Sequence, residues 1–150
     1  MHFEMDEEVI AWKVRDFVLT GKPFLIGGST PYGFHLGPAF YYLSAIPLFF
    51  SRLDPIGWSY LSVITGGMGI MAAYYVGKQM YGKQTGLIMA TLWAFSFRQV
   101  FFDRHWWPMV LNPLMGLLAV WSWWGIIGNK GKKWWLLLGV VLSFAWQADL

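Results

Sequence analysis

Residues 56–77 read IGWSYLSVITGGMGIMAAYYVG and contain no charged side chain. A helix needs about 20 apolar residues to cross the hydrocarbon core of a bilayer, so this stretch predicts a transmembrane helix. The composition of the whole chain agrees, because only 13% of its 150 residues are charged and 57% are hydrophobic. A typical soluble domain is about 25% charged.

Three further segments extend this pattern. Residues 108–127 are long and apolar enough for a span, with Pro113 as an expected kink. Residues 85–102 nearly qualify but carry Arg98 near one end, and residues 134–150 begin a fourth expected span. Residues 36–50 are apolar but short, which favours a re-entrant or interfacial helix over a span. The sequence therefore predicts an all-α, polytopic transmembrane protein.

The basic residues predict an orientation. Two lysine-bearing turns lie on either side of the spans 85–102 and 108–127, and excess Lys and Arg marks the cytoplasmic side of a membrane protein. The loop 98–107 and residues 1–35 are then extracytoplasmic, provided that residues 36–50 do not cross. We expect a multi-pass protein of the cell membrane, with residues 36–150 as its membrane region. The lysines of the two turns are Lys78, Lys83, Lys130, Lys132 and Lys133.

Composition also excludes several kinds of site and partner. The chain has no cysteine, so it has no disulfide and no thiolate metal ligand or nucleophile. Its basic residues are scattered and its net charge is only +3, which argues against a nucleic-acid partner. Eleven Trp and seven Tyr fit the aromatic belts at the two surfaces of a membrane, where lipids are the expected partners.

The first part of the chain predicts an amphipathic helix over residues 6–20. Ile10, Val14 and Phe17 share one face by helical spacing. Gly21 is the expected end of this helix.

The same segment concentrates acidic charge. Four of the eight acidic residues of the chain lie in FEMDEEVIAW, residues 3–12. A partly desolvated carboxylate at the membrane edge, Asp6 or Glu7, has a raised proton affinity and could act as a general base. Acidic residues at a helix start also interact favourably with the helix dipole, and the spacing alone leaves both interpretations open.

A basic and aromatic segment is the second candidate. Residues 98–107 read RQVFFDRHWW and place Arg98, Arg104 and His105 among aromatic rings. Guanidinium groups bind phosphate oxygens in pairs, and the rings could line a path for a lipid tail. The alternative is ordinary anchoring at the bilayer edge.

Two further titratable residues are weaker candidates. His35 could bind a phosphate or a metal, but a lone histidine is more often structural and no second ligand lies at metal spacing. Asp149 would be an intramembrane carboxylate, a functional candidate by default.

These segments, in this order, resemble the GT-C superfamily of glycosyltransferases that use lipid-linked sugars. The nearest resemblance is to family 39 and its bacterial relatives, which include protein O-mannosyltransferases, the aminoarabinose transferase of lipid A and Rgt-type lipopolysaccharide transferases. DEEVIAWKVRDFVLTGKPFLIG resembles the Asp-Glu motif and juxtamembrane helix, which places Asp6 on the catalytic aspartate. FHLGPAFYYL resembles the next element of the family. Its matching residues are His35, Gly37, Pro38, Tyr41 and Tyr42.

The resemblance continues along the chain. FFDRHWWP resembles the Ser-Arg-x-x-Trp-Asn-Pro loop, with Arg104 and Trp107 matching, Asp103 in place of the serine and no Asn before the proline. SFAWQADL resembles the Ala-x-Gln-x-His helix, with Gln147 matching and Asp149 where His is common. The cytoplasmic turn of the family resembles GKQMYGKQTG. Its matching residues are Gly77, Lys78, Gly82, Lys83 and Gly86.

The resemblance implies transfer of a sugar from a polyprenyl phosphate to an acceptor hydroxyl on a lipid, glycan or protein. Asp6, with Glu7, would be catalytic, and Arg104, Arg98 and His35 would bind the donor phosphate. Four further residues would line the substrate path: Tyr41, Tyr42, Trp107 and His105. No cofactor is required by this reading, and a divalent metal is left open. Because the chain ends within an apolar segment, we expect it to be a fragment, inactive alone.

Two other functions fit the sequence pattern. One is a non-catalytic membrane subunit that binds a lipid. The other is a transporter or flippase for a lipid-linked substrate, although such proteins tend to contain internal repeats, and none is visible in this sequence.

Overall fold

The computed structural model describes residues 5–23, 25–28, 35 and 37–148. Within these residues the regular structure is helical and no β-strand is present, which confirms the all-α prediction. The helices are α1 (Met5–Thr20), α2 (Ala39–Phe50), α3 (Ile56–Tyr81), α4 (Lys83–Phe95), α5 (Phe97–Phe102), the 3₁₀ turn η1 (Pro108–Leu111), α6 (Asn112–Ile127) and α7 (Lys133–Ala148).

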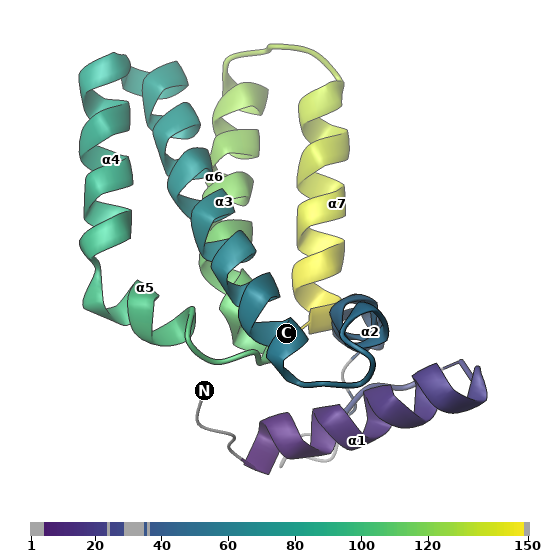
Figure 1. Cartoon of the computed structure of the whole chain (residues 1–150). Helices are drawn as coiled ribbons and strands as arrows, with labels where there is room; N and C mark the ends of the chain where they lie inside the picture. The colour runs from purple at the N-terminus through teal and green to yellow at the C-terminus, as the bar shows by residue number, and fades with distance from the viewer. Residues whose placement is uncertain (1–4, 24, 29–34, 36, 149–150) are drawn as a thin grey trace.

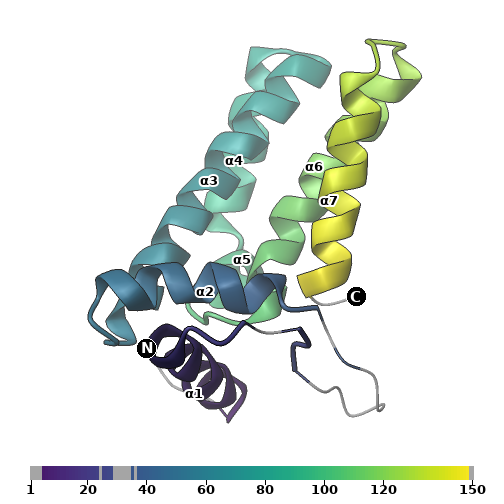
Figure 2. The same ribbon diagram turned by 90° about the vertical axis from the view of Figure 1, so that its right-hand side faces the viewer.

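Four helices stand upright as two antiparallel pairs, α3 with α4 and α6 with α7 (Figures 1 and 2). The remaining helices α1, α2 and α5 lie across the lower end of these pairs. Helix α1 packs against α2, which in turn contacts the start of α3 and the lower end of α7. The molecule therefore has a helical body and a cap of short helices at one end.

Glycines let the paired helices approach closely. A Cβ on Gly86 of α4 would lie 2.6 Å from the carbonyl oxygen of Tyr74 and 2.9 Å from the amide nitrogen of Lys78, both on α3. In the other pair, the indole of Trp134 lies directly against Gly125. Gly86 therefore allows close backbone contact between α3 and α4, as small residues do at many helix crossings, whereas Gly125 makes room for an indole between α6 and α7.

The sequence predicts one helix over residues 85–102, but the structure has two, α4 and α5. Helix α4 ends at Phe95, and Ser96 has an extended conformation and caps α5 by accepting a hydrogen bond from the amide of Gln99. Ser-x-x-Gln is a helix-start pattern, and here it overrides the apolar run. Helix α5 turns away from the axis of α4 and lies across the lower end (Figure 1).

Pro113 does not kink a span. The structure has the 3₁₀ turn η1 before α6, and Pro113 lies in the first turn of α6. The first turn of a helix has amides without intrahelical acceptors, so a proline there removes no helical hydrogen bond. The predicted kink is therefore wrong.

Among the described residues, two helical segments are long and apolar enough to cross a membrane. They are α3 (Ile56–Tyr81) and η1 together with α6 (Pro108–Ile127). Helix α2 has 12 residues, so it is about 18 Å long, and it lies roughly perpendicular to the upright helices (Figure 2). A helix of this length is too short to cross a hydrocarbon core of about 30 Å.

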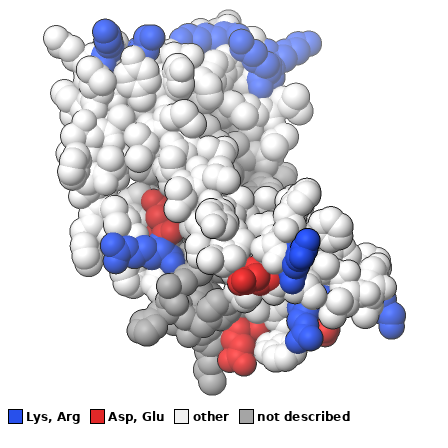
Figure 3. All heavy atoms as spheres, in the orientation of Figure 1, with Lys and Arg blue, Asp and Glu red and all other residues white. Residues whose placement is uncertain are grey.

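Charge is distributed unevenly along the body. On the face seen in Figure 3, Lys and Arg gather at the upper end, a broad band without charged atoms follows, and acidic and basic groups are mixed at the lower end. The upper end carries the α3–α4 and α6–α7 turns. Large hydrophobic side chains are exposed on the body, including Val63 at 74%, Phe95 at 85% and Trp146 at 69%.

Replacing Gly86 with Ala should destabilise the α3–α4 pair, because the new Cβ would meet backbone atoms that cannot rotate away. We expect a loss of about 1–3 kcal/mol, as for other overpacked sites. Gly67→Ala on α3 is the control, since a Cβ there meets no described atom within 4 Å and alanine gains up to about 1 kcal/mol of helix propensity. Unfolding in detergent checks both variants, and equal stability would contradict the close crossing.

Candidate functional site

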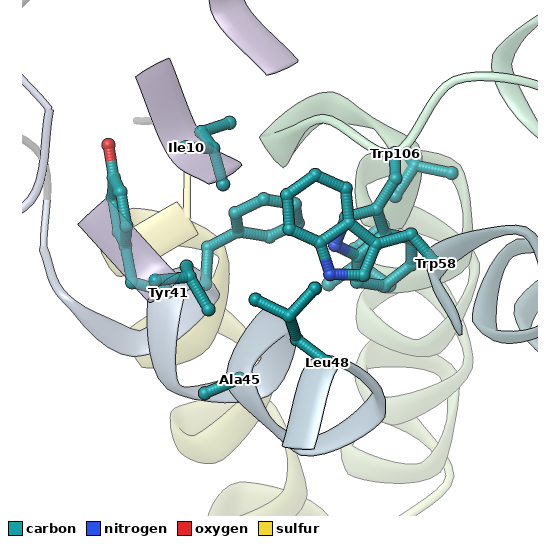
Figure 4. Packing of buried hydrophobic residues seen from close by; sticks show 10 residues of the cluster. Ile10, Tyr41, Ala45, Leu48, Trp58 and Trp106 are labelled. Atoms are coloured by element: carbon teal, nitrogen blue, oxygen red, sulfur yellow. The ribbon is translucent and has the colours of Figure 1, made fainter. Parts of the chain in front are cut away.

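A buried cluster at the lower end joins the segments that carry the candidate site. Ser44 of α2 is its centre: its hydroxyl accepts a hydrogen bond from the indole N–H of Trp106 at 2.8 Å and donates to the carbonyl oxygen of Phe40 at 2.8 Å. The carbonyl oxygen of Ser44 accepts from the indole N–H of Trp58 at 3.0 Å. Figure 4 shows both indoles packed together beside Leu48. One residue therefore ties α2 to the start of α3 and to the segment that follows α5.

Helix α1 docks onto this cluster through its apolar face. Ile10 and Val14 are buried in it, and the ring of Phe17 packs edge-on against Tyr42 at 5.3 Å. The helix ends where expected, since Gly21 has a positive φ of 68° and its amide donates to the carbonyl oxygen of Phe17. The helix predicted over residues 6–20 is confirmed as α1, and its docking fixes the acidic first turn at this end.

The side chains of Asp6 and Glu7, the candidate catalytic residues, lie outside the described part of the structure. Their backbone belongs to the first turn of α1. The neighbouring Glu8 is exposed and accepts a hydrogen bond from the indole N–H of Trp12 at 3.5 Å. The described residues thus place the acidic turn without defining its carboxylate geometry. Asp149 also lies outside the described residues.

The candidate phosphate-binding residues are on the surface. Arg98 on α5, Arg104 after α5 and His35 are all exposed. His105 is half-buried and lies between the rings of Phe101, at 5.2 Å, and Trp107, at 6.5 Å. Trp106, which lies between His105 and Trp107 in the sequence, is fully buried in the cluster. Residues 98–107 are therefore held at the same end as α1.

The two tyrosines predicted to line a substrate path both contact other parts of the protein. Tyr41 is buried, and its hydroxyl approaches Gly28 so closely that a Cβ there would lie 2.8 Å away. Tyr42 is half-buried against Phe17. Lys13 of α1 lies 5.6 Å from the centre of the Tyr41 ring and donates to the carbonyl oxygen of Gly27 at 3.5 Å. These tyrosines therefore position α1 and the chain that follows it.

The structure adds a cavity that the sequence did not indicate. A hollow of about 370 Å³ lies between α1 and the α2–α3 connection, and Arg15 stands at 5.1 Å from the ring of Trp12 beside it. In the sequence, the one local sign of this pairing is that Trp12 and Arg15 are three residues apart, which places both side chains on one face of α1. The lining residues are Ala11, Trp12, Arg15, Leu48, Leu53 and Pro55.

Asp103 is a second feature not chosen from the sequence. Its carboxylate accepts a hydrogen bond from the side-chain amide of Gln99 at 2.9 Å and lies against Gly66 of α3, where a Cβ would be 2.9 Å from it. Burial raises the pKa of Asp103 above its ordinary value, and the bond from Gln99 opposes this in part. The carboxylate thus lies where the end of α5 comes close to α3.

No group of three or more His, Asp or Glu side chains within the described ranges could hold a metal ion. Comparisons with protein-family profiles, with characterised proteins and with solved structures find no match for this chain. The functional argument therefore rests on the residues themselves.

Ser44→Ala should weaken the whole lower end. The change removes the hydroxyl that accepts from Trp106, and a buried hydrogen bond of this kind contributes about 0.5–1.5 kcal/mol. Thermal unfolding in detergent measures the loss, with Ser143→Ala, at an exposed position of α7, as the matched control. Equal effects of the two changes would argue against Ser44 as the centre of the cluster.

Asp103 should make stability depend on pH. Because its pKa is raised on folding, the folded chain binds more protons than the unfolded chain, and stability falls as pH rises through the window that begins near pH 4, about the ordinary aspartate value. Asp103→Asn should flatten this part of the curve, whereas Asp16→Asn, an exposed position of α1, tests the loss of a carboxylate elsewhere. Unfolding midpoints from about pH 4 to pH 7 decide, and an unchanged slope in Asp103→Asn would contradict the assignment.

Proposed function

We propose that the chain is part of a multi-pass membrane glycosyltransferase that moves a sugar from a polyprenyl phosphate to an acceptor hydroxyl. One observation carries the proposal: the helix that begins with Asp6 and Glu7 and the segment that bears Arg98 and Arg104 join one buried cluster at the same end of the bundle. The resemblance to GT-C enzymes assigns a base to the first segment and phosphate binding to the second.

The proposed membrane placement follows from the charge distribution. The four upright helices, which include the two apolar ones, would lie in the bilayer. The uncharged band of Figure 3 would lie in the hydrocarbon core, and the lysine turns would face the cytoplasm. The lower end, with α1 and Arg104, is then extracytoplasmic. A polyprenyl tail would remain in the membrane while its phosphate lies at this surface.

The proposed reaction is a single inverting displacement. Asp6 accepts the proton of the acceptor hydroxyl, the oxygen attacks the anomeric carbon, and the bond from that carbon to the phosphate oxygen breaks. Negative charge develops on the departing phosphate, and Arg104, with Arg98 or His35, would stabilise it there. Arginine suits this role because its planar group forms paired hydrogen bonds with phosphate oxygens. Exposure of all three side chains leaves them accessible to a substrate.

Asp6→Asn should lower the rate of transfer about 10²–10⁴-fold, the typical contribution of a general base. Glu8→Gln is the matched control, because Glu8 is exposed and its carboxylate already accepts from Trp12. The measurement uses the full-length protein in nanodiscs with a panel of radiolabelled polyprenyl-phosphate sugars.

The outcomes separate the functions. Turnover that is lost in Asp6→Asn and kept in Glu8→Gln supports the proposal. Equal losses in both variants would remove Asp6 as the base. Binding of the lipid sugar without turnover, in the wild type as in the variant, would favour a non-catalytic lipid-binding subunit.

A further inference from the structure

A second cavity lies at the opposite end of the molecule, among α3, α6 and α7. Its volume is about 330 Å³, and the elements that form it meet near the lysine turns (Figure 1). Its lining combines one charged, one amide and three apolar or aromatic side chains. The lining residues are Gln79, Lys133, Trp121, Trp134 and Leu137.

The amide of Gln79 is oriented by its neighbour. The indole N–H of Trp121 donates to the side-chain oxygen of Gln79 at 3.2 Å. Since an indole N–H can only donate, the NH₂ group of Gln79 must be on the other side of the amide. Within the described residues this group has no hydrogen-bond acceptor, so it can donate to a bound oxygen.

One wall of the cavity is a packed indole. The indole of Trp134 is buried, packs edge-on against Trp121 at 5.0 Å and lies directly on Gly125. The turn between α6 and α7 is closed by two backbone hydrogen bonds, Lys130 to Gly125 and Asn129 to Ile126, a pairing that terminates helices tightly. This turn fixes the start of α7, where Lys133 lies 5.7 Å from the centre of the Trp134 ring.

The surroundings favour a negatively charged ligand. The two turns at this end carry five lysines, and the sequence has no acidic residue from Pro55 to Phe102 or from Arg104 to Ala148. Figure 3 shows this basic end above a band without charged atoms. A ligand with an anionic group and an apolar tail matches both parts of the surface.

We propose that this cavity binds the phosphodiester headgroup of an anionic phospholipid. Lys133 pairs with the phosphate charge, the NH₂ of Gln79 donates to a phosphate oxygen, and Trp121 and Leu137 contact the start of an acyl chain. The inference rests on the membrane placement proposed above but not on the transfer reaction. Arginine and lysine clusters at the cytoplasmic surface are attracted to anionic lipids in general, and this site adds an amide donor oriented by Trp121 and aromatic walls.

The test compares two variants with the same chemical change. Gln79→Glu keeps the oxygen that accepts from Trp121 and replaces the NH₂ donor with a second carboxylate oxygen that repels phosphate. Gln84→Glu makes the same change at an exposed position of α4, at the same end but outside the cavity. Retention of phosphatidylglycerol against phosphatidylcholine is measured by native mass spectrometry of the full-length protein, and unfolding temperatures confirm that both variants fold.

We expect Gln79→Glu to reduce the affinity for phosphatidylglycerol about tenfold and Gln84→Glu to reduce it less than about threefold, since a charge at the surface acts only through the general field. Lys133→Gln should match Gln79→Glu. Equal losses in Gln79→Glu and Gln84→Glu would overturn the site and leave only general attraction.

A separate arm distinguishes the source of the phosphate. Inorganic phosphate should not displace the lipid at millimolar concentration, and displacement would assign the cavity to a soluble anion instead. Asp6→Asn should retain phosphatidylglycerol as the wild type does. Absence of specific lipid binding with intact sugar transfer would overturn this inference alone. Intact lipid binding without sugar transfer would overturn the proposed function alone.

Discussion

The lower end depends on the hydrogen bonds of Ser44. Its hydroxyl and carbonyl oxygens receive the indole N–H groups of Trp106 and Trp58 from opposite directions along the chain. Trp58 and Trp106 are fully buried, so their polar nitrogens need acceptors inside the fold, and an unmade buried hydrogen bond is costly. These bonds hold α2 across the ends of the upright helices and give α1 an apolar surface on which to dock.

At the lower end, a packed core and an exposed basic surface are compatible because different residues supply them. Trp106 is buried and fixes the backbone of residues 98–107, whereas Arg98 and Arg104 are exposed on the same short stretch. A binding group is positioned best when neighbouring side chains are locked by packing. With Trp106 buried and Arg98 and Arg104 exposed, this segment is both part of the core and available as part of a surface site.

Sequence reasoning succeeded where the signal is local. The helix at α1 was predicted from the spacing of Ile10, Val14 and Phe17, since a helical period is visible within a few turns. The bonds of Ser44 could not be predicted, because Trp106 lies 62 residues away along the chain and a buried serine carries no periodic signal. The apolar composition of residues 85–102 predicts one continuous helix, whereas the Ser96 and Gln99 capping pattern breaks it in two.

That break decides where the arginines lie. A helix rises about 1.5 Å per residue, so α4 continued straight from Phe95 would carry Arg104 about 13 Å further along its axis. Instead α5 turns across the lower end, Gln99 donates to Asp103, and the Asp103 carboxylate lies close to Gly66 of α3. The following Trp106 then reaches Ser44, and Arg104 lies at the same end as the acidic turn of α1. A cap formed by Ser96 thus controls whether the two halves of the proposed site can meet.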